Sequence, residues 1–254
     1  MSKPSSEKPD YGNWVPAPLL VISGGIGVLL VGLSLIFPIL IVGAVVFLLV
    51  FAYFAYARYR LSYKGGELQA RIQNLVIDHL SWDGQGKALD IGCGNAPLTV
   101  KLAKEYPDAD VVGIDTWRGL GEYSRKRCER NAELEGVADR VSFQQASAAT
   151  LPFADRSFDA VVSNLVFHEV KDAKDKADVI KEALRVVKKG GGFAFQDLFF
   201  AKRLYGAADD LLEKLRGWGI QNVGLVDTGN LQFIPRAAKL PFMLGGMGVL
   251  FGRK

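Results

Sequence analysis

Hydrophobic residues are distributed unevenly along this chain. The stretch from Tyr11 to Ala57 contains no charged residue, whereas the rest of the chain alternates short apolar runs with polar segments. One membrane crossing takes about 20 apolar residues, so this stretch is long enough for two. Pro38 lies near its middle and would interrupt a continuous helix. The pattern predicts a transmembrane helical hairpin over roughly 17–36 and 39–57, with a tight turn between the two helices.

Other interpretations of the apolar stretch stay open. A cleaved signal peptide has an apolar core of about 7–15 residues, which is much shorter than this stretch. A single crossing, with the other half lying in the interface, also fits because the predicted turn is itself apolar. Arg58, Arg60 and Lys64 follow at once, and basic residues favour the cytoplasmic side. We expect an integral membrane protein whose remaining chain lies in the cytoplasm.

The composition divides the chain into four regions. Residues 1–14 are largely polar and predict a disordered tail. Residues 15–57 form the predicted hairpin, and residues 58–66 form a basic linker. Residues 67–254 are long enough for one large domain.

This last region alternates between the periods of strands and helices. Short apolar runs predict strands at residues 88–91, 111–114, 141–144, 160–163 and 193–196. Amphipathic stretches predict helices at residues 67–81, 98–105, 121–135 and 173–187, with glycines 190–192 ending the last of them. After a helix at 207–215, residues 221–226 and 247–252 predict an antiparallel pair. The alternation predicts an α/β fold: a Rossmann-like, doubly wound, mostly parallel sheet with helices on both faces.

Charge and cysteine usage exclude several classes of protein. The net charge is +4, and the charges up to Ala57 cancel, so the basic excess lies after the apolar stretch and suits an anionic bilayer surface. The one dense basic cluster, at residues 125–130, predicts a solvated helix face, so no nucleic-acid partner is expected. Two cysteines, Cys93 and Cys128, and two histidines do not have the spacing of a metal site.

The candidate chemistry begins at residues 88–97, where a predicted strand breaks into glycines. Gly92 and Gly94 permit a tight turn and a close approach of the backbone to a ligand. The start of the helix that follows favours a carboxylate or a phosphate. Asp115 ends the next predicted strand and is placed to accept hydrogen bonds from ribose hydroxyls. These residues predict a nucleotide site, but Pro97 stands where a dinucleotide fingerprint has its last glycine.

Residues 90–96 read Asp-x-Gly-x-Gly-x-Ala, and this turn resembles that of the class I S-adenosylmethionine-dependent methyltransferases. The resemblance covers roughly residues 68–254, with further blocks in the family's order at residues 151–155, 157–159, 160–164 and 185–191. It implies a seven-stranded sheet whose last strand is inserted antiparallel. It also implies S-adenosylmethionine as the cofactor.

The resemblance assigns roles to the strand ends. Asp90 matches the acid that helps hold the methionine ammonium, Gly92 and Gly94 pass beneath the cofactor, and Asp115, followed by Thr116, matches the ribose acid. Asn164 lies in the segment that borders the cofactor methyl group and the acceptor.

One position departs from the family pattern. Many relatives carry Gly-Asp-Ala before Leu-Pro-Phe, and this chain has Ala146, Ser147 and Ala148 there. We expect Ser147, with Ala148, to contact the adenine, through a hydrogen bond weaker than that of a carboxylate.

His168 and Asp197 are the candidate catalytic residues. A base is needed only when the acceptor is a hydroxyl or an acidic carbon, and His168 stands beside the expected methyl position with a side chain that titrates near neutrality. Asp197 follows the fifth predicted strand. Structural roles stay open for both: His168 as a partner of the strand end, and Asp197 as a helix cap or an ion-pair partner.

Three functions remain under consideration. The first is a membrane-anchored methyltransferase acting on a lipophilic acceptor such as a quinone, an isoprenoid or a lipid headgroup. The second is methylation of a membrane-associated protein or of a soluble small molecule, with the anchor serving only for location. The third is a tethered, non-catalytic assembly or interaction protein, which the replacement at Ser147 favours and the Asp90, Gly92, Gly94 and Asp115 set disfavours.

Overall fold

The computed structural model describes residues 7–118, 123–240 and 243–254. The chain forms two compact units: residues 12–70 make one, and residues 71–254, together with the segment before Gly12, make the other. The expected helix at 121–135 is α5 (Arg125–Leu134), and residues 121–122 lie outside the described residues.

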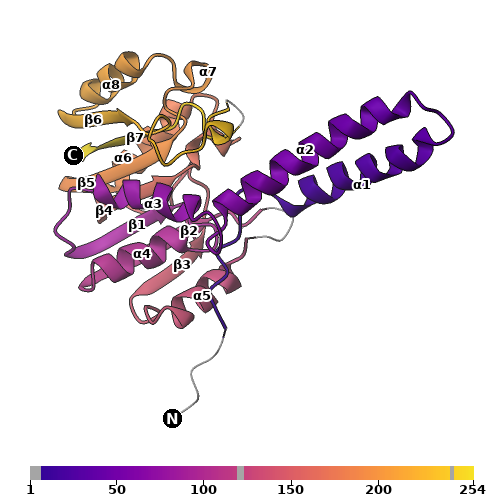
Figure 1. The fold of residues 1–254 in the computed structure, drawn as a ribbon. Coiled ribbons are helices and arrows are strands. Elements are labelled where there is room, and N and C mark those ends of the chain that lie inside the picture. Colours follow the sequence, from indigo (N-terminus) through magenta and orange to yellow (C-terminus); the bar gives the residue numbers. More distant parts are fainter. Residues whose placement is uncertain (1–6, 119–122, 241–242) are drawn as a thin grey trace, which may run out of the picture. The chain divides into compact units, whose positions relative to one another are not determined.

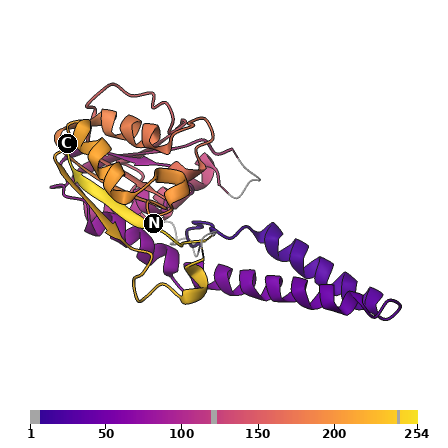
Figure 2. The ribbon, with the colours of Figure 1, turned by 90° about the horizontal axis from the view of Figure 1, so that it is seen from above.

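The first unit contains two long helices, α1 (Ala17–Ser34) and α2 (Leu40–Leu61). They lie side by side and antiparallel (Figure 2). Glycines sit at their contact: a Cβ on Gly27 would lie 2.8 Å from the Leu48 side chain, and one on Gly24 would lie 3.0 Å from Phe51. Small residues of this kind let two helix backbones approach closely. Pro38 lies in the turn, as the sequence predicts, and α2 continues four residues into the expected basic linker, through Leu61.

Both helices are long and apolar enough to cross a membrane. A helix of 18 residues such as α1 spans about 27 Å, close to the thickness of a bilayer's hydrocarbon core. Their side chains are mostly exposed: in the described part of the chain, all exposed large hydrophobic residues except Val226 and Leu240 lie between Leu19 and Tyr59. The hydroxyl of Ser23 donates to the carbonyl of Leu19 (2.6 Å) and so needs no partner outside its helix.

Polar contacts close the open end of this hairpin. The Asn13 amide donates to the carbonyl of Arg58 (2.9 Å), and the Arg58 guanidinium donates to the carbonyl of Val15. The backbone N–H of Trp14 donates to Gln69 (3.2 Å). The segment before α1 and the last turn of α2 are therefore joined by hydrogen bonds, and Arg58 takes part in both of them.

The second unit is built on a seven-stranded sheet in the order β3-β2-β1-β4-β5-β7-β6 (Figure 1). Its strands are β1 (Gly86–Ile91), β2 (Ala109–Asp115), β3 (Val141–Gln145), β4 (Phe158–Asn164), β5 (Val187–Asp197), β6 (Asn222–Asp227) and β7 (Gly248–Arg253). The first five pair in parallel, and β7 lies antiparallel between β5 and β6. The mostly parallel sheet and the inserted last strand are confirmed.

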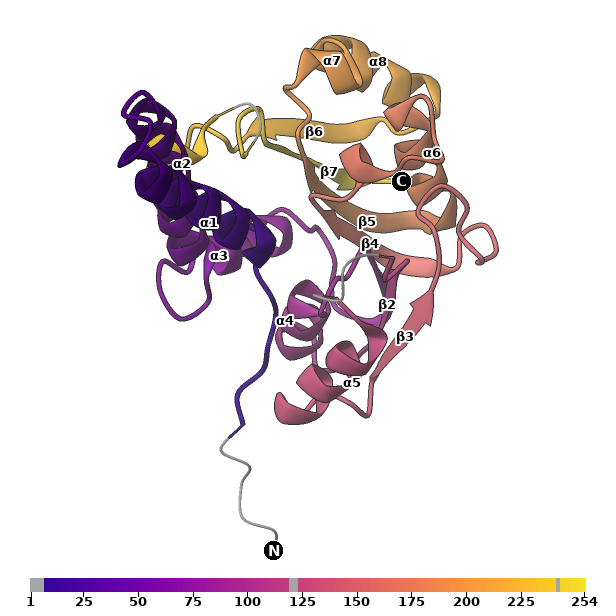
Figure 3. The ribbon, with the colours of Figure 1, turned by 90° about the vertical axis from the view of Figure 1, so that its right-hand side faces the viewer.

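Helices cover both faces of this sheet (Figure 3). One core cluster contains residues of α6 (Lys176–Val186), α7 (Lys202–Tyr205) and α8 (Ala208–Gly217), and the other contains residues of α3 (Leu68–Asp78), α4 (Pro97–Glu105) and α5. The strands alternate accordingly, because successive side chains point to opposite faces: Leu89 and Val161 belong to the first cluster, and Ala88 and Val162 to the second.

The end of α6 differs from the sequence prediction. The helix ends at Val186, and β5 begins at once, so the glycines at 190–192 lie inside a strand and do not cap the helix. The pairing with β4 shifts register there, from Phe158↔Val187 to Ala160↔Gly192. The glycines therefore form a bulge, a feature that sequence patterns do not separate from a helix stop.

The segment before the hairpin also differs from the expectation. Residues 7–11, predicted as part of a disordered tail, make hydrogen bonds and ion pairs with α5. Composition alone predicted disorder because this segment has few apolar residues, but polar contacts to one helix hold it. Residues 1–6 of the expected tail lie outside the described residues.

Candidate active site

The glycine-rich turn follows β1 and leads into α4. The N–H groups of Gly92 and Cys93 both donate to the carbonyl of Ile114 (2.8 and 2.9 Å), which ties the turn to the end of β2. Gly92, Gly94 and Ala96 all have positive φ (74°, 57° and 66°). Glycine adopts this conformation without strain, but Ala96 does so at a cost because of its Cβ. The left-handed conformation of Ala96, the last residue of the Asp-x-Gly-x-Gly-x-Ala turn, was not predicted from the sequence.

The two glycines are needed for different reasons. A Cβ on Gly92 would lie 2.2 Å from a methyl group of Val166, so this glycine makes room for the segment after β4. Around Gly94 the nearest atom to such a Cβ is the Tyr123 ring at 3.4 Å, which is an ordinary contact. The backbone conformation alone therefore requires Gly94, whereas packing also requires Gly92.

Asp115 closes the second strand and faces the turn. Its carboxylate accepts from the N–H of Gly94 (3.0 Å) and from that of Trp117 (2.8 Å). The Trp117 indole donates to the carbonyl of Gly94 (2.9 Å) and so braces the same turn. A carboxylate has about four lone-pair sites, which leaves room for the ribose hydroxyls that the sequence predicts as its partners. Thr116, the next predicted contact, accepts from Gln145 through its carbonyl (2.7 Å).

Asp90 is a buried acid below the turn. Its side chain is 1% exposed and accepts from the Thr99 hydroxyl (2.6 Å). Burial raises the pKa of Asp90 to about 7, against the hydrogen bond from Thr99. No ion pair among the described residues involves this carboxyl group. An acid buried without a basic side chain is suited to receive a cationic group of a ligand.

Unsatisfied polar atoms gather at the ends of β4 and β5. In the described part of the chain, three buried side-chain atoms have no hydrogen-bond partner: Asn164 Oδ1, Gln196 Oε1 and the Tyr205 hydroxyl. Asn164 and Gln196 are paired in register, and Tyr205 follows shortly after β5. Buried side-chain oxygens without a partner are rare in folded proteins, so the adjacent amide oxygens of Asn164 and Gln196 mark a place where a ligand's donors can be received.

The two candidate catalytic residues lie together. The Nδ1 of His168 is 2.8 Å from Oδ1 of Asp197, which is fully buried. The Asp197 carboxylate also accepts from the N–H groups of Phe167 (2.8 Å), His168 (3.3 Å) and Leu198 (2.7 Å). Asp197 therefore holds both the ring of His168 and the 3-10 turn (Phe167–Glu169) that carries it.

This pair sets the protonation of the histidine. Burial lowers the pKa of His168, but the hydrogen bond and the charge of Asp197 outweigh it, so the pKa lies above its ordinary value. With Nδ1 donating to the carboxylate, Nε2 carries the lone pair and is the atom that takes a proton. The sequence proposed these residues as separate candidates, and their direct contact appears only in the fold.

The predicted adenine contact is already engaged. The Ser147 hydroxyl accepts from the N–H of Ala149 (3.2 Å) and lies 3.4 Å from the carboxylate of Asp172, while Ala148 is buried. Asp172 brings a carboxylate beside the position where this chain lacks the family's acid. Its place 25 residues further along the chain gave no signal in the sequence.

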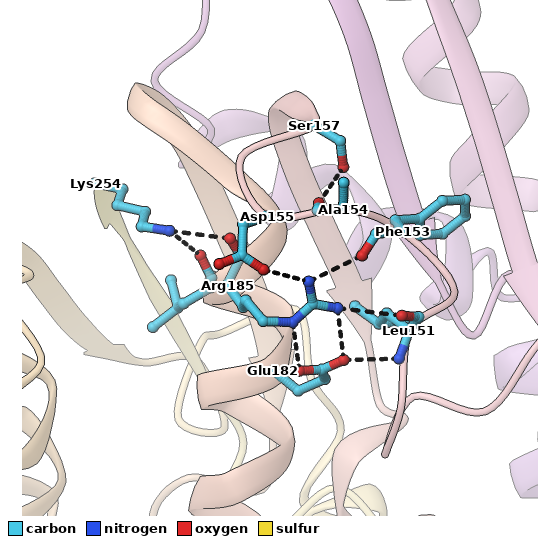
Figure 4. Close-up of polar contacts among 9 residues, drawn as sticks. Leu151, Phe153, Ala154, Asp155, Ser157, Glu182, Arg185 and Lys254 are labelled. Atoms are coloured by element: carbon cyan, nitrogen blue, oxygen red, sulfur yellow. Dashed lines mark hydrogen bonds and ion pairs between the residues drawn. The ribbon is translucent and has the colours of Figure 1, made fainter.

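A hydrogen-bonded network around Arg185 joins α6 to the segment between β3 and β4 (Figure 4). Arg185 donates to the carbonyls of Leu151 (3.1 Å) and Phe153 (2.9 Å) and pairs with Glu182 (2.8 Å) and Asp155 (2.7 Å). Glu182 in turn accepts from the N–H of Leu151 (2.7 Å). Two of the sequence blocks that carry the family resemblance are thus parts of one hydrogen-bonded unit, which fixes the segment between β3 and β4.

The residues present fit S-adenosylmethionine. A nucleoside with a methionine group needs acceptors for ribose hydroxyls and an anion for its ammonium, and Asp115 and Asp90 supply them at neighbouring strand ends. The orphaned Asn164 oxygen offers another acceptor at the next strand. Thr99, Gln196, Tyr205 and Asp172 were not predicted; only their burial or their contacts in the fold reveal them.

Comparisons with known proteins agree with this assignment. Residues 89–195 match a family model described as a methyltransferase domain. The chain is 31% identical to 27-O-demethylrifamycin SV methyltransferase of Amycolatopsis mediterranei (68% of this chain, 61% of that protein). It is 36% identical to a sterol 24-C-methyltransferase of Aspergillus fumigatus (42% and 26%) and 31% identical to a ubiquinone/menaquinone biosynthesis C-methyltransferase of Desulfotalea psychrophila (48% and 45%). The chain thus spans between 26% and 61% of the length of these relatives.

Solved structures share the fold at low identity. The geranyl diphosphate C-methyltransferase of Streptomyces coelicolor matches with a TM-score of 0.52 at 17% identity, covering 79% of this chain and 81% of that one. The cyclase SpnF matches with a TM-score of 0.54 at 22% identity, covering 72% and 80%. These matches establish the Rossmann-like architecture; the chemistry must come from the site itself.

Proposed function

We propose that this chain, which belongs through residues 89–195 to the class I S-adenosylmethionine-dependent methyltransferase family, transfers a methyl group from that cofactor to a lipophilic acceptor at a membrane. The main support for a lipophilic acceptor is the pair of long apolar helices on the same chain. Anchoring an enzyme in a bilayer concentrates it where such substrates dissolve, whereas a water-soluble substrate gains nothing from it.

The names of the relatives support the same class of acceptor. They specify a sterol, the quinones ubiquinone and menaquinone, and a rifamycin. For this chain we propose only what these substrates have in common: the acceptor is a small and largely apolar molecule.

The cofactor would be held by residues already in place. Asp115 would accept from the ribose hydroxyls, Asp90 would receive the methionine ammonium, and the turn at Gly92 and Gly94 would support the cofactor. Ser147 and Ala148 would contact the adenine, and Asn164 would contact the methionine side. When bound, S-adenosylmethionine supplies an electrophilic methyl group on a sulfonium. Because displacement at that carbon needs alignment above all, the main task of these residues is positioning.

His168 supplies proton transfer where the acceptor needs it. Its Nε2 takes the proton of an acceptor hydroxyl or acidic carbon, and Asp197 stabilises the imidazolium that results. Asp197 raises the pKa of His168 above its ordinary value, which makes the imidazole a stronger base. Asp197 acts through His168 and is a positioning residue.

The hairpin is proposed to cross the bilayer twice, with both of its ends on the cytoplasmic side. Arg58 and Arg60 in the last turn of α2 support this orientation because basic residues are retained there. Protease protection of tags on the two chain ends, in sealed inverted vesicles, tests it. Cleavage of both tags from outside is expected, and protection of either tag contradicts it.

The function is tested with tritium-labelled S-adenosylmethionine. The full chain, reconstituted in vesicles with lipid extract from its source, is expected to place label in the organic phase. Asp115→Ala should abolish the transfer by weakening cofactor binding, and His168→Gln should lower it only if proton removal is needed. Label confined to protein or to the aqueous phase would contradict the lipophilic acceptor and favour the second function considered above.

A further inference from the structure

The segment that precedes the hairpin, residues 7–11, packs along α5 and is called here the N-terminal strap. Its contacts run the length of that helix. Glu7 pairs with Arg130, Asp10 lies 3.6 Å from Arg127, and the Tyr11 hydroxyl donates to Glu135 (2.9 Å). The two ion pairs join side chains that are 44–67% exposed, so they contribute little to holding the strap.

The central contact is made by Asn131, whose residue is 2% exposed. Its Oδ1 accepts from the backbone N–H of Asp10 (2.9 Å), and its Nδ2 donates to the backbone carbonyl of the same residue (2.9 Å). The side-chain amide therefore pairs with Asp10 as a neighbouring strand would. Such a two-bond contact fixes both the position of the strap and the orientation of the amide.

The same amide reaches the cofactor turn. The second hydrogen of Nδ2 is donated to the carbonyl of Asn95, also at 2.9 Å. Asn95 follows Gly94, is fully buried, and precedes Ala96, the residue held at a left-handed φ of 66°. Asn131 thus joins the strap to the strained end of the turn, while Asp115 holds the other side of it through the Gly94 N–H.

We infer that the N-terminal strap positions the cofactor turn through Asn131 and thereby raises the affinity for S-adenosylmethionine. With the strap in place, Asn131 has three hydrogen bonds and one available orientation. Without the strap, the two hydrogen bonds to Asp10 are replaced by hydrogen bonds to water. The Asn131 side chain can then rotate and break its hydrogen bond to the carbonyl of Asn95. The carbonyl of Asn95 then loses this partner, and Ala96 has less to hold it in its left-handed conformation. The inference rests on the proposed function for the identity of the ligand only.

The test uses the full chain in detergent and S-adenosylhomocysteine as the probe in titration calorimetry. Deletion of residues 2–10 and Asn131→Ala should each weaken binding by roughly five- to tenfold, the value of about one hydrogen bond. Because both act through one contact, the combined variant should be no weaker than Asn131→Ala alone. Asp10→Ala is the matched control: Asn131 is bonded to the backbone of Asp10, and the exposed pair of Asp10 with Arg127 contributes little, so binding should be almost unchanged.

Hydrogen–deuterium exchange provides a readout that does not depend on the ligand. In ligand-free protein, the deletion should speed exchange across residues 92–98 and leave β5 unaffected. Ile220→Val, which removes a methyl group from the other core cluster, controls for a general loss of stability and should not change the turn.

Three results would overturn the inference: unchanged affinity and exchange in the deletion, fully additive effects of the two changes, or weakened binding in Asp10→Ala. Absence of binding to the unaltered chain would instead refute the proposed function, and the exchange data would still decide the role of the strap. If the deletion does not fold, the affinities of Asn131→Ala and Asp10→Ala for S-adenosylhomocysteine are compared instead. Weaker binding in Asn131→Ala alone supports the inference, and equal binding refutes it.

Discussion

Asp197 offers the sharpest test of the site, because one buried carboxylate holds the candidate base and its turn. It accepts from the N–H groups of Phe167, His168 and Leu198 and from the ring of His168, at 2.7–3.3 Å. In Asp197→Asn one oxygen remains as an acceptor, and the new NH₂ group faces donors. About two charge-assisted hydrogen bonds are lost, at roughly 1.5–3 kcal/mol each, so we expect a loss of about 3–6 kcal/mol.

Thermal unfolding of the detergent-purified full chain measures this loss. For a domain of this size, 1 kcal/mol shifts Tm by about 2–4 °C, so the variant should melt about 10 °C lower. Asp139→Asn is the control, since Asp139 is exposed and its one ion pair among the described residues is with its neighbour Arg140; its shift should be close to zero. Equal shifts for the two variants would mean that the Asp197 carboxylate does not organise the turn.

The same variant should change the titration of His168. Asp197 raises the pKa of His168 against the effect of burial. The pKa should therefore fall in Asp197→Asn, where burial and the charge of Lys176 lower it and only the charge of Glu169 still raises it. In the unaltered protein, the raised pKa contributes stability that is complete below about pH 6.5 and is lost as the pH rises through the folded-state pKa. The imidazole signals in NMR, assigned with His79→Gln, report the shift, and an unmoved pKa refutes the pairing.

Two further predictions concern the buried acid and the supporting network. Because burial raises the pKa of Asp90 to about 7, binding of S-adenosylhomocysteine should strengthen as the pH rises through that value and should release a proton. Calorimetry in buffers of different ionisation enthalpy measures the number of protons released on binding. The same binding enthalpy in all buffers, or the same proton release in Asp90→Asn, would contradict the assignment. Arg185→Ala removes hydrogen bonds to Leu151, Phe153 and two carboxylates, and should cost about 2–3 kcal/mol of stability. The control is Arg125→Ala, which breaks an exposed ion pair and should cost under about 0.5 kcal/mol of stability. Similar losses of stability in Arg185→Ala and Arg125→Ala would show that the network around Arg185 does not form.

Local sequence patterns were sufficient to predict much of the architecture. The periodicity placed the strands and most helices within a few residues, because alternation and the 3.6-residue repeat reflect which face of an element is buried. Pro38 and the charge-free stretch were sufficient to predict the two long helices and their turn. The sequence missed the bulge at 190–192 since glycines serve a bulge and a helix stop equally well.

The sequence by itself determined which groups stand at the strand ends: Asp90, Asp115, Asn164 and Asp197 each follow an apolar run, and a parallel sheet brings such ends to one edge. Only the tertiary structure decided how these groups combine. The contact of His168 with Asp197, the carboxylate of Asp172 beside Ser147, and the contact of Asn131 with Asp10 join residues between 25 and 121 positions apart. Hydrogen bonds over such separations depend on side-chain orientation and burial, which arise when the whole sheet and its helices pack together, and no local pattern encodes them.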